Sequence, residues 1–243
     1  MALKILVNGA RGRMGHAVIS AAREAGDVVA AEIDAGDDIR SAITGCDVVI
    51  DFSAHGATRG VIEAAVAAGK PLIIGTTGHA VAERDALRVL AAKVPTVWAS
   101  NFSVGVNVLF HLVGRAAKAL PAEFEIEIVE MHHRFKKDAP SGTAASLAEV
   151  AREARSLPPE AVVHGREGIT GERPRAQIGM HALRGGDVVG DHTVIFAALG
   201  ERLELAHKAG DRAILARGAV HAAHWVVTQK PGLYDMQDVL GLR

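Results

Sequence analysis

The chain has 243 residues, 49% of them hydrophobic, and a formal net charge of −1 at pH 7. This length and apolar content can bury one large core or two modest ones, so the composition is compatible with two domains. Acidic and basic residues are interspersed, which argues against nucleic acid or an anionic membrane surface as a partner.

Cysteine content and hydropathy restrict the class of protein further. Cys46 is the single cysteine, which excludes an internal disulfide and a cysteine-based zinc site. No signal-type apolar segment precedes residues 3–7, and no later apolar run approaches the roughly 20 residues that cross a bilayer. We therefore expect a soluble, cytoplasmic protein.

The first 100 residues alternate short β-branched runs with longer alanine-rich helical patterns. Strands are predicted at 4–7, 28–33, 47–52, 72–74 and 96–99, and helices at 14–25, 58–68 and 81–92. Strands separated by helices of this length imply βαβ crossovers, and hence an α/β fold with a Rossmann-like parallel sheet. Ligands of such sheets bind at the carboxyl edge.

A glycine-rich turn follows the first predicted strand. It consists of Gly9, Ala10, Arg11, Gly12, Arg13, Met14 and Gly15. The spacing is G-x-x-G-x-x-G rather than the commoner G-x-G-x-x-G, and a glycine turn alone is often a structural connector. A strand before it and a helix after it favour a dinucleotide cradle, because the glycines permit a tight turn and close approach of phosphate. The turn predicts NADH or NADPH as cofactor.

Carboxylates at the end of the second predicted strand are candidates for binding a ribose. Asp34 lies 19 residues after Gly15, at the strand end, and is the first choice; Glu32 is the second. Either acid can instead be an ordinary solvated loop residue. Arg11 and Arg13 can receive a 2′-phosphate, so the choice between NADH and NADPH stays open.

Three further segments at the predicted carboxyl edge are expected to line the nicotinamide half of the cofactor. Small and hydroxyl residues there allow backbone groups to reach the carboxamide and the ribose, although the Gly-Thr-Thr-Gly sequence can equally be a helix-capping turn. The candidate residues are Phe52, Gly75, Thr76, Thr77, Ala99, Ser100, Asn101 and Phe102.

The pattern changes after residue 101. Helices are predicted at 106–120, from about 142 to 155 and at 213–227, and strands at 124–130, 177–183, 188–197 and 202–207. Contiguous β-rich sequence of this kind predicts a second domain of α+β type with a mixed sheet. We expect a dinucleotide-binding domain over 1–103, completed by 212–243, and a substrate-binding and oligomerisation domain over 104–211.

The run from Glu130 to Thr143 concentrates titratable groups beside a helix start. His132, His133 and Lys136 can carry protons and bind an anion near neutral pH. The sequence Ser141-Gly142-Thr143 then opens a helix, whose N–H groups favour a carboxylate or phosphate. Taken singly, each feature is more often a solvated side chain or a simple cap. Their crowding, with a dinucleotide site elsewhere that needs a partner, predicts a small-anion site.

These motifs together resemble the 4-hydroxy-tetrahydrodipicolinate reductase family, also called dihydrodipicolinate reductase. The resemblance covers essentially the whole chain and rests on residues 9–15, 75–78, 101–105, 132–143 and 185–193. It implies that His132 and Lys136 donate protons, that His133 contacts the substrate, and that Gly142 with Thr143 binds a substrate carboxylate. It also implies a homotetramer built through the β-rich domain. Ser100 departs from the proline of many relatives.

The activity implied by the resemblance is NAD(P)H-dependent reduction of 4-hydroxy-tetrahydrodipicolinate to tetrahydrodipicolinate, in diaminopimelate and lysine biosynthesis. Cofactor and substrate on separate domains would require closure, with hinges expected near Ser103 and Arg212. A non-catalytic NAD(H)-binding regulator is the alternative. A histidine-based metal hydrolase is disfavoured, because adjacent histidines do not easily aim at one ion and no H-E-x-x-H spacing occurs. No metal is predicted.

Overall fold

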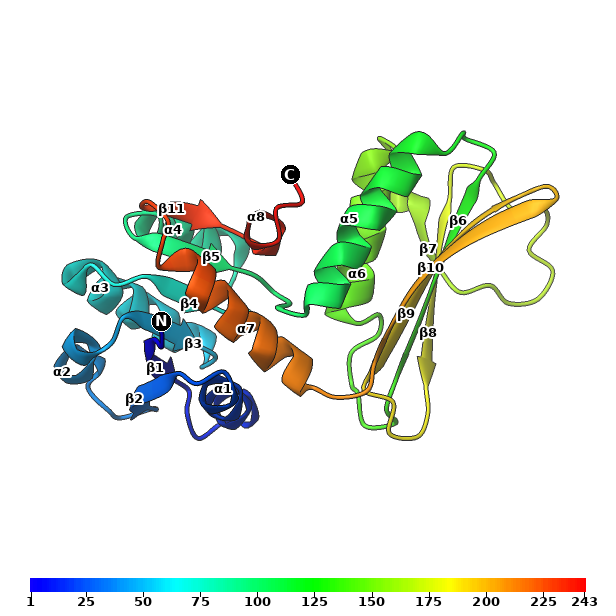
Figure 1. Ribbon diagram of the computed structural model, residues 1–243. Coiled ribbons are helices and arrows are strands. Elements are labelled where there is room, and N and C mark those ends of the chain that lie inside the picture. Colours follow the sequence, from blue (N-terminus) through cyan, green and yellow to red (C-terminus); the bar gives the residue numbers. More distant parts are fainter. The chain divides into compact units, whose positions relative to one another are not determined.

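The computed structural model describes residues 1–243 and divides them into two compact units. The first comprises Met1–Val104 and Arg212–Arg243, and the second comprises Gly105–Asp211. Figure 1 shows both units with their helices and strands labelled. No helix combines the length and apolar composition needed to cross a membrane.

The first unit is built on a six-stranded sheet in the order β11-β5-β4-β3-β1-β2, with every pair of neighbours parallel. The chain moves from β1 to β2 on one side and then to β3 on the other side of β1. Ligand sites of open parallel sheets lie at such a switch point. The strands are β1 (Lys4–Asn8), β2 (Val28–Ile33), β3 (Val48–Asp51), β4 (Leu72–Ile74), β5 (Pro95–Trp98) and β11 (Gly232–Tyr234).

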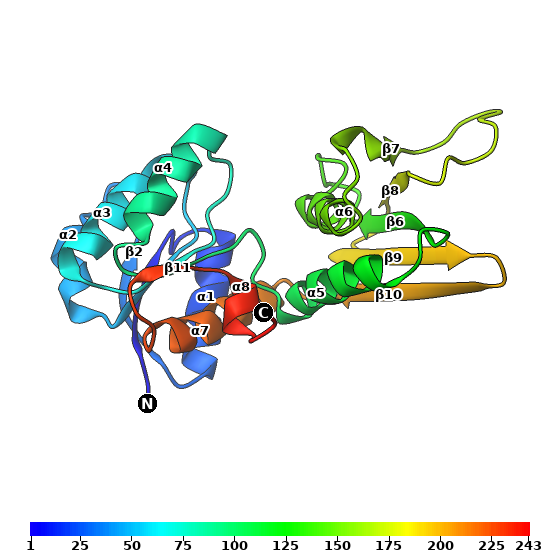
Figure 2. The same cartoon turned by 90° about the horizontal axis from the view of Figure 1, so that it is seen from above.

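Helices cover both faces of this sheet, as Figure 2 shows. One apolar core joins α1 and α7 to Ile5 and Val7 of β1, and a second joins α3 and α4 to Leu6 of the same strand. Burial on both faces explains why the central strands are continuous apolar runs. The helices are α1 (Arg13–Glu24), α2 (Ile39–Ala42), α3 (Thr58–Ala68), α4 (Val81–Ala91), α7 (Ala213–Val226) and α8 (Met236–Val239), with 3₁₀ turns η1 (Ile43–Gly45) and η2 (His55–Ala57).

The second unit contains a mixed sheet in the order β10-β9-β6-β8-β7. Neighbours β10, β9 and β6 are antiparallel, whereas β6, β8 and β7 are parallel. The predicted mixed sheet is therefore confirmed. Its elements are α5 (Val104–Ala119), β6 (Glu125–His132), α6 (Gly142–Ala154), η3 (Pro159–Ala161), β7 (Val162–His164), β8 (Ile178–Arg184), β9 (Gly190–Ala198) and β10 (Glu201–Ala209).

Helices α5 and α6 pack on one face of the mixed sheet (Figure 1). Alternate residues of β6 point to this face, so Ile126 and Ile128 are buried in the core while Glu127 lies on the opposite face. There Glu127 accepts hydrogen bonds from Arg166, Arg173 and His181. Burial raises the pKa of Glu127, but these hydrogen bonds outweigh it and lower the value to about 2.

Candidate active site

Strand register gathers a polar cluster at the carboxyl end of β6. Glu130 and His132 continue the inward-facing series of Ile126 and Ile128, and both side chains are buried. Across the sheet, Glu130 is the register partner of His192 on β9, and His132 is the partner of Arg184 on β8. Because register partners project to the same face, one site receives side chains from three strands.

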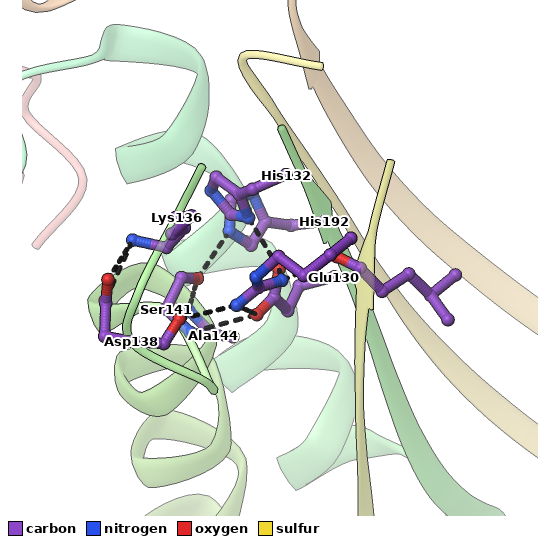
Figure 3. A network of polar contacts seen from close by, with 9 residues as sticks. Glu130, His132, Lys136, Asp138, Ser141, Ala144 and His192 are labelled. Carbon is purple, nitrogen blue, oxygen red and sulfur yellow. Dashed lines mark hydrogen bonds and ion pairs between the residues drawn. The ribbon is translucent and has the colours of Figure 1, made fainter. Parts of the chain in front are cut away.

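Glu130 is the centre of this cluster, as Figure 3 shows. Its carboxylate is fully buried and accepts from Nδ1 of His132 at 2.5 Å. Both guanidinium N–H groups of Arg184 donate to it, at 2.8 and 2.9 Å, and the main-chain N–H of Ser141 donates at 3.1 Å. Burial raises the pKa of Glu130, yet the hydrogen bonds from Arg184, His132 and Ser141 outweigh it and hold the pKa below its ordinary range.

The ionised carboxylate determines how the His132 ring is used. An ionised carboxylate only accepts hydrogen bonds, so Nδ1 of His132 carries the proton of the short contact with Glu130. The other ring nitrogen, Nε2, lies beside Gly190, where a Cβ atom would stand only 2.9 Å from it. The absence of a side chain at Gly190 therefore leaves room for the His132 ring.

His192 packs edge-on against His132 with ring centroids 5.1 Å apart. Burial, followed by the neighbouring His132, lowers the pKa of His192 to about 4. His192 is therefore neutral near pH 7 and adds no positive charge next to His132. Its Nε2 atom lies 3.1 Å from the Ser141 hydroxyl oxygen.

Ser141, which the sequence places in the small-anion site as a substrate-binding candidate, is held by hydrogen bonds within the protein. Its side chain is the N-cap of α6 and accepts from the N–H of Ala144, and its main-chain N–H donates to Glu130. The residue is buried. The next residues, Gly142 and Thr143, begin the helix, and Gly142 is exposed. The positive end of the α6 dipole lies there.

Lys136 lies on the loop between β6 and α6, beside the histidines (Figure 3). Its ammonium donates to both oxygens of Asp138, at 2.9 and 2.8 Å. This contact lowers the pKa of Asp138. Asp138 is mostly exposed, so the ion pair is weakly stabilising and exchangeable. The main chain of His133 is anchored on Val188, because its N–H donates to that carbonyl at 2.7 Å.

The first unit contains a cavity of about 480 Å³ at the predicted switch point. Predicted residues Gly9, Gly12, Asp34 and Phe52 line it. The remaining predicted cofactor residues do not. Asn8 and Ser53, which flank predicted positions, also line it. Lining residues that sequence reasoning missed are Ile33, Ala35, Gly36, Asp37, Ile39, Ala54, Ala57, Gly60 and Val61. They lie at the end of β2, in the segment that follows it, and between β3 and the first turn of α3, and the position of these strand ends at the carboxyl edge was the available signal.

The glycine turn has the close packing that a dinucleotide cradle requires. Gly9 has φ of +82° and its N–H donates to the carbonyl of Ile33, which holds the turn against the end of β2. A Cβ atom at Gly15 would lie 2.1 Å from the carbonyl oxygen of Gly9. Gly12 caps α1, so the first-turn N–H groups of a 12-residue helix follow the turn directly. These residues fit a dinucleotide pyrophosphate.

The carboxylates near this turn differ in whether they line the cavity or pair with an arginine outside it. Asp34 lines the cavity and accepts from the N–H groups of Ala35 and Arg11, which lower its pKa. Glu32, the second choice, instead pairs with Arg23 at 3.1 Å. The Arg11 guanidinium contacts Asp37 at 3.3 Å. Asp34 is thus the acid positioned at the predicted site.

A buried carboxylate, Asp51, ties the ends of three strands together. It accepts from Asn8 at 2.7 Å, from the Ser53 hydroxyl at 2.6 Å and from the Thr76 hydroxyl at 2.8 Å. Burial raises the pKa of Asp51, while these donors oppose the rise. The side chain of Thr76, expected at the cofactor, is therefore buried in a network that orders the loops.

Aromatic residues expected at the nicotinamide half also have structural roles. Phe102 is 1% exposed and belongs to the core that includes α1 and α7. Its ring packs edge-on against Phe52 at 5.6 Å, and Phe52 in turn occupies the space that a Cβ atom at Gly75 would need. Thr77 and Ser100 are exposed, and Ala99 and Asn101 are half-buried.

The dinucleotide-type sheet of the first unit and the cluster around Glu130 and His132 in the second fit one class, the two-domain pyridine-nucleotide oxidoreductases. Family models sharpen this: "Dihydrodipicolinate reductase, N-terminus" matches residues 3–102 and "Dihydrodipicolinate reductase, C-terminus" matches 105–240. The chain therefore belongs to the dihydrodipicolinate reductase family.

Individual relatives agree with this assignment. The chain is 54% identical to the 4-hydroxy-tetrahydrodipicolinate reductase of Akkermansia muciniphila, over 99% of this chain and 98% of that protein. It is 47% identical to that of Syntrophus aciditrophicus, over 99% of each. A dipicolinate-bound dihydrodipicolinate reductase from Paenisporosarcina sp. TG-14 shares the fold, with a TM-score of 0.74 at 21% identity over 97% of this chain and 98% of that one.

Proposed function

We propose that this protein reduces 4-hydroxy-tetrahydrodipicolinate to tetrahydrodipicolinate with NAD(P)H, a step of diaminopimelate and lysine biosynthesis. The observation that carries the proposal is the His132 ring, held by a buried carboxylate beside Lys136 and the start of α6. The names of relatives at 54% and 47% identity support the same reaction.

The reaction consumes one hydride and one proton and releases water. A nicotinamide bound in the first unit would supply the hydride for the unsaturated ring of the substrate. His132 donates the proton that accompanies the hydride from Nε2, because its Nδ1 proton is committed to Glu130. A general acid so placed contributes about 10²- to 10⁴-fold to the rate. Lys136 is the second proton donor: it protonates the departing hydroxyl, and the ring gives up one C–H proton as the water leaves, so the net consumption stays at one proton.

The two substrate carboxylates provide orientation. One binds the N–H groups of Gly142 and Thr143, at the positive end of the α6 dipole. The other binds His133 and the Lys136 ammonium. Because the ion pair of Lys136 with Asp138 is largely exposed, a substrate carboxylate can replace Asp138 at low cost.

We infer that NADH is used better than NADPH. Asp34 and Asp37 line the cavity, and their negative charges accept from ribose hydroxyls but repel a 2′-phosphate. Arg11 contacts Asp37, which reduces its capacity to bind that phosphate.

Replacing Asp34 by alanine should shift this preference. We expect kcat/KM with NADH to fall about 10- to 100-fold, the loss of one or two hydrogen bonds to a charged group, and kcat/KM with NADPH to change less than about threefold. Steady-state assays with each nucleotide measure the ratio. Asp38→Ala is the matched control, because Asp38 caps α2 and does not line the cavity. Equal losses with both nucleotides would contradict ribose binding by Asp34.

We further propose that the chain forms a homotetramer through the sheet face opposite α5 and α6. Half-buried Val129, Met131 and Ile195 lie on that face, and Leu183 is 49% exposed. Sedimentation equilibrium should give a mass near four times the 25.4 kDa of one chain. Val129→Asp should lower that mass, because it places a charge in the apolar contact. A wild-type mass of one chain at all concentrations would refute the assembly.

The reaction itself is tested by a coupled assay with substrate generated by the preceding synthase. Oxidation of NADH and of NADPH is followed separately, with and without the substrate. Substrate-dependent oxidation is the expected result. Tight nucleotide binding without turnover would instead favour a non-catalytic NAD(H)-binding regulator.

A further inference from the structure

The geometry points to Glu130 as the positioning residue of His132, with Arg184 as the cation that keeps Glu130 ionised and in place. This inference rests on the proposed function, because it concerns the proton that His132 donates. It assigns roles to two residues for which the sequence patterns gave none.

The carboxylate of Glu130 has no spare hydrogen-bonding capacity. Oε1 accepts from Ser141 and Arg184, and Oε2 accepts from His132 and Arg184. Four donors match the four acceptor directions of a carboxylate. The group therefore cannot bind substrate or transfer a proton itself, and its action on the reaction passes through the His132 ring.

A buried charge lowers the stability of a protein, so its presence at position 130 indicates a function beyond packing. Removing an ion from water costs several kcal/mol, and apolar residues of similar volume often stabilise a core better. Glu127 shows the contrast on the same strand: it also accepts from arginines and a histidine, yet it lies on the other face of the sheet and is partly exposed. Burial of Glu130 against His132 is therefore better explained by control of the imidazole.

The same carboxylate connects the parts of the cluster. It holds the N-cap residue of α6 through the Ser141 N–H. Arg184, bound to Glu130, also donates to the main-chain carbonyl of Asp138 at 2.6 Å. The carboxylate of Asp138 in turn accepts from the Lys136 ammonium. Fixing Glu130 thus fixes the imidazole, the helix start and the loop that bears the second proton donor.

Charged and titratable groups surround His132 from each neighbouring element. Glu130 lies on the same strand as His132, neutral His192 on β9, Arg184 on β8 and Lys136 on the following loop. Glu130 is the carboxylate in direct contact with the ring, where it accepts from Nδ1. Without that acceptor, neither the tautomer nor the orientation of the ring is fixed, and Nε2 no longer presents its proton in one direction.

Glu130→Gln is the decisive variant, because it keeps the side-chain size and removes the charge. We expect kcat to fall about 10- to 100-fold, because the proton-donating ring loses the group that orients it. In ¹⁵N-histidine-labelled protein, a downfield Nδ1–H signal of His132 should be present in the wild type and lost in the variant. Glu149→Gln is the matched control, because it also removes a glutamate charge that pairs with an arginine, and it should leave kcat and the signal unchanged.

An unchanged kcat together with an unchanged Nδ1–H signal in a folded Glu130→Gln protein would overturn the inference. If that variant does not fold, Arg184→Lys tests the same point, since it keeps the charge but loses the two-pronged contact; it should lower kcat and weaken the signal, and wild-type values would refute the role of Arg184. The NMR signal needs no substrate. Absence of turnover in the wild type would thus defeat the proposed function, whereas a signal that persists in Glu130→Gln would defeat this inference alone.

Discussion

His132→Gln should lower kcat for substrate reduction by about 10³-fold while the Kd of NADH changes less than about twofold. The substitution removes a general acid, whose contribution spans about 10²- to 10⁴-fold. The glutamine amide can still donate to Glu130, so the buried carboxylate keeps a partner and the cost to folding stays small. The cofactor cavity lies wholly in the first unit, so NADH binding has no reason to change.

Stopped-flow turnover and NADH fluorescence titration measure the two quantities. His224→Gln is the control, because it also removes an imidazole that contacts a carboxylate, that of Asp27, and neither residue lines the cofactor cavity. The control should retain turnover. Parallel losses of kcat and NADH affinity in His132→Gln would count against proton donation and would indicate a damaged fold.

Long periodic segments made the fold predictable. The strand at 28–33 and the helix at 58–68 agree with β2 and α3 residue for residue, because one repeats an apolar face and the other ends at Gly69 with φ of +63°. The elements that were missed are short: α2 and α8 have four residues each, and β7 and β11 have three. Such segments show no periodicity of their own and form through their neighbours.

The cluster around Glu130 and His132 was predictable only in part. His132 and Lys136 stand out because they crowd into one segment, but Glu130, Arg184 and His192 come together through strand register, which one sequence does not reveal. A signal did exist for Glu130: period two from Ile126 and Ile128 places it on the core face. A carboxylate on an apolar face needs a buried partner.

Prediction of the dinucleotide site from sequence was limited in a different way. Motif positions identify which loops take part, not which atoms face the ligand. Thr76 and Phe102 lie in the expected loops, yet one binds Asp51 and the other fills the core. Buried Asp51 has three donors, so its role is to order loops around the cavity. The hydrogen-bond demand of buried Asp51 decided the orientation of Thr76, and apolar packing decided that of Phe102.

Gly15→Ala should weaken NADH binding at least about 100-fold. Its Cβ atom would stand 2.1 Å from the Gly9 carbonyl oxygen and 2.6 Å from the Ala10 Cα, and neither backbone atom can rotate away as a side chain would. The start of α1 must therefore move from the turn, which spoils the N–H geometry that receives the pyrophosphate. Overpacking of this kind also costs about 1–3 kcal/mol of stability.

Calorimetric titration with NADH and thermal unfolding without nucleotide separate these two effects. Gly45→Ala provides the control, because a Cβ atom there meets nothing within 4 Å and the residue does not line the cavity. A Gly15→Ala protein that binds NADH as tightly as Gly45→Ala would show that the turn tolerates displacement. The pyrophosphate would then have to be held elsewhere, and the helix start of α1 would have no part in binding the cofactor.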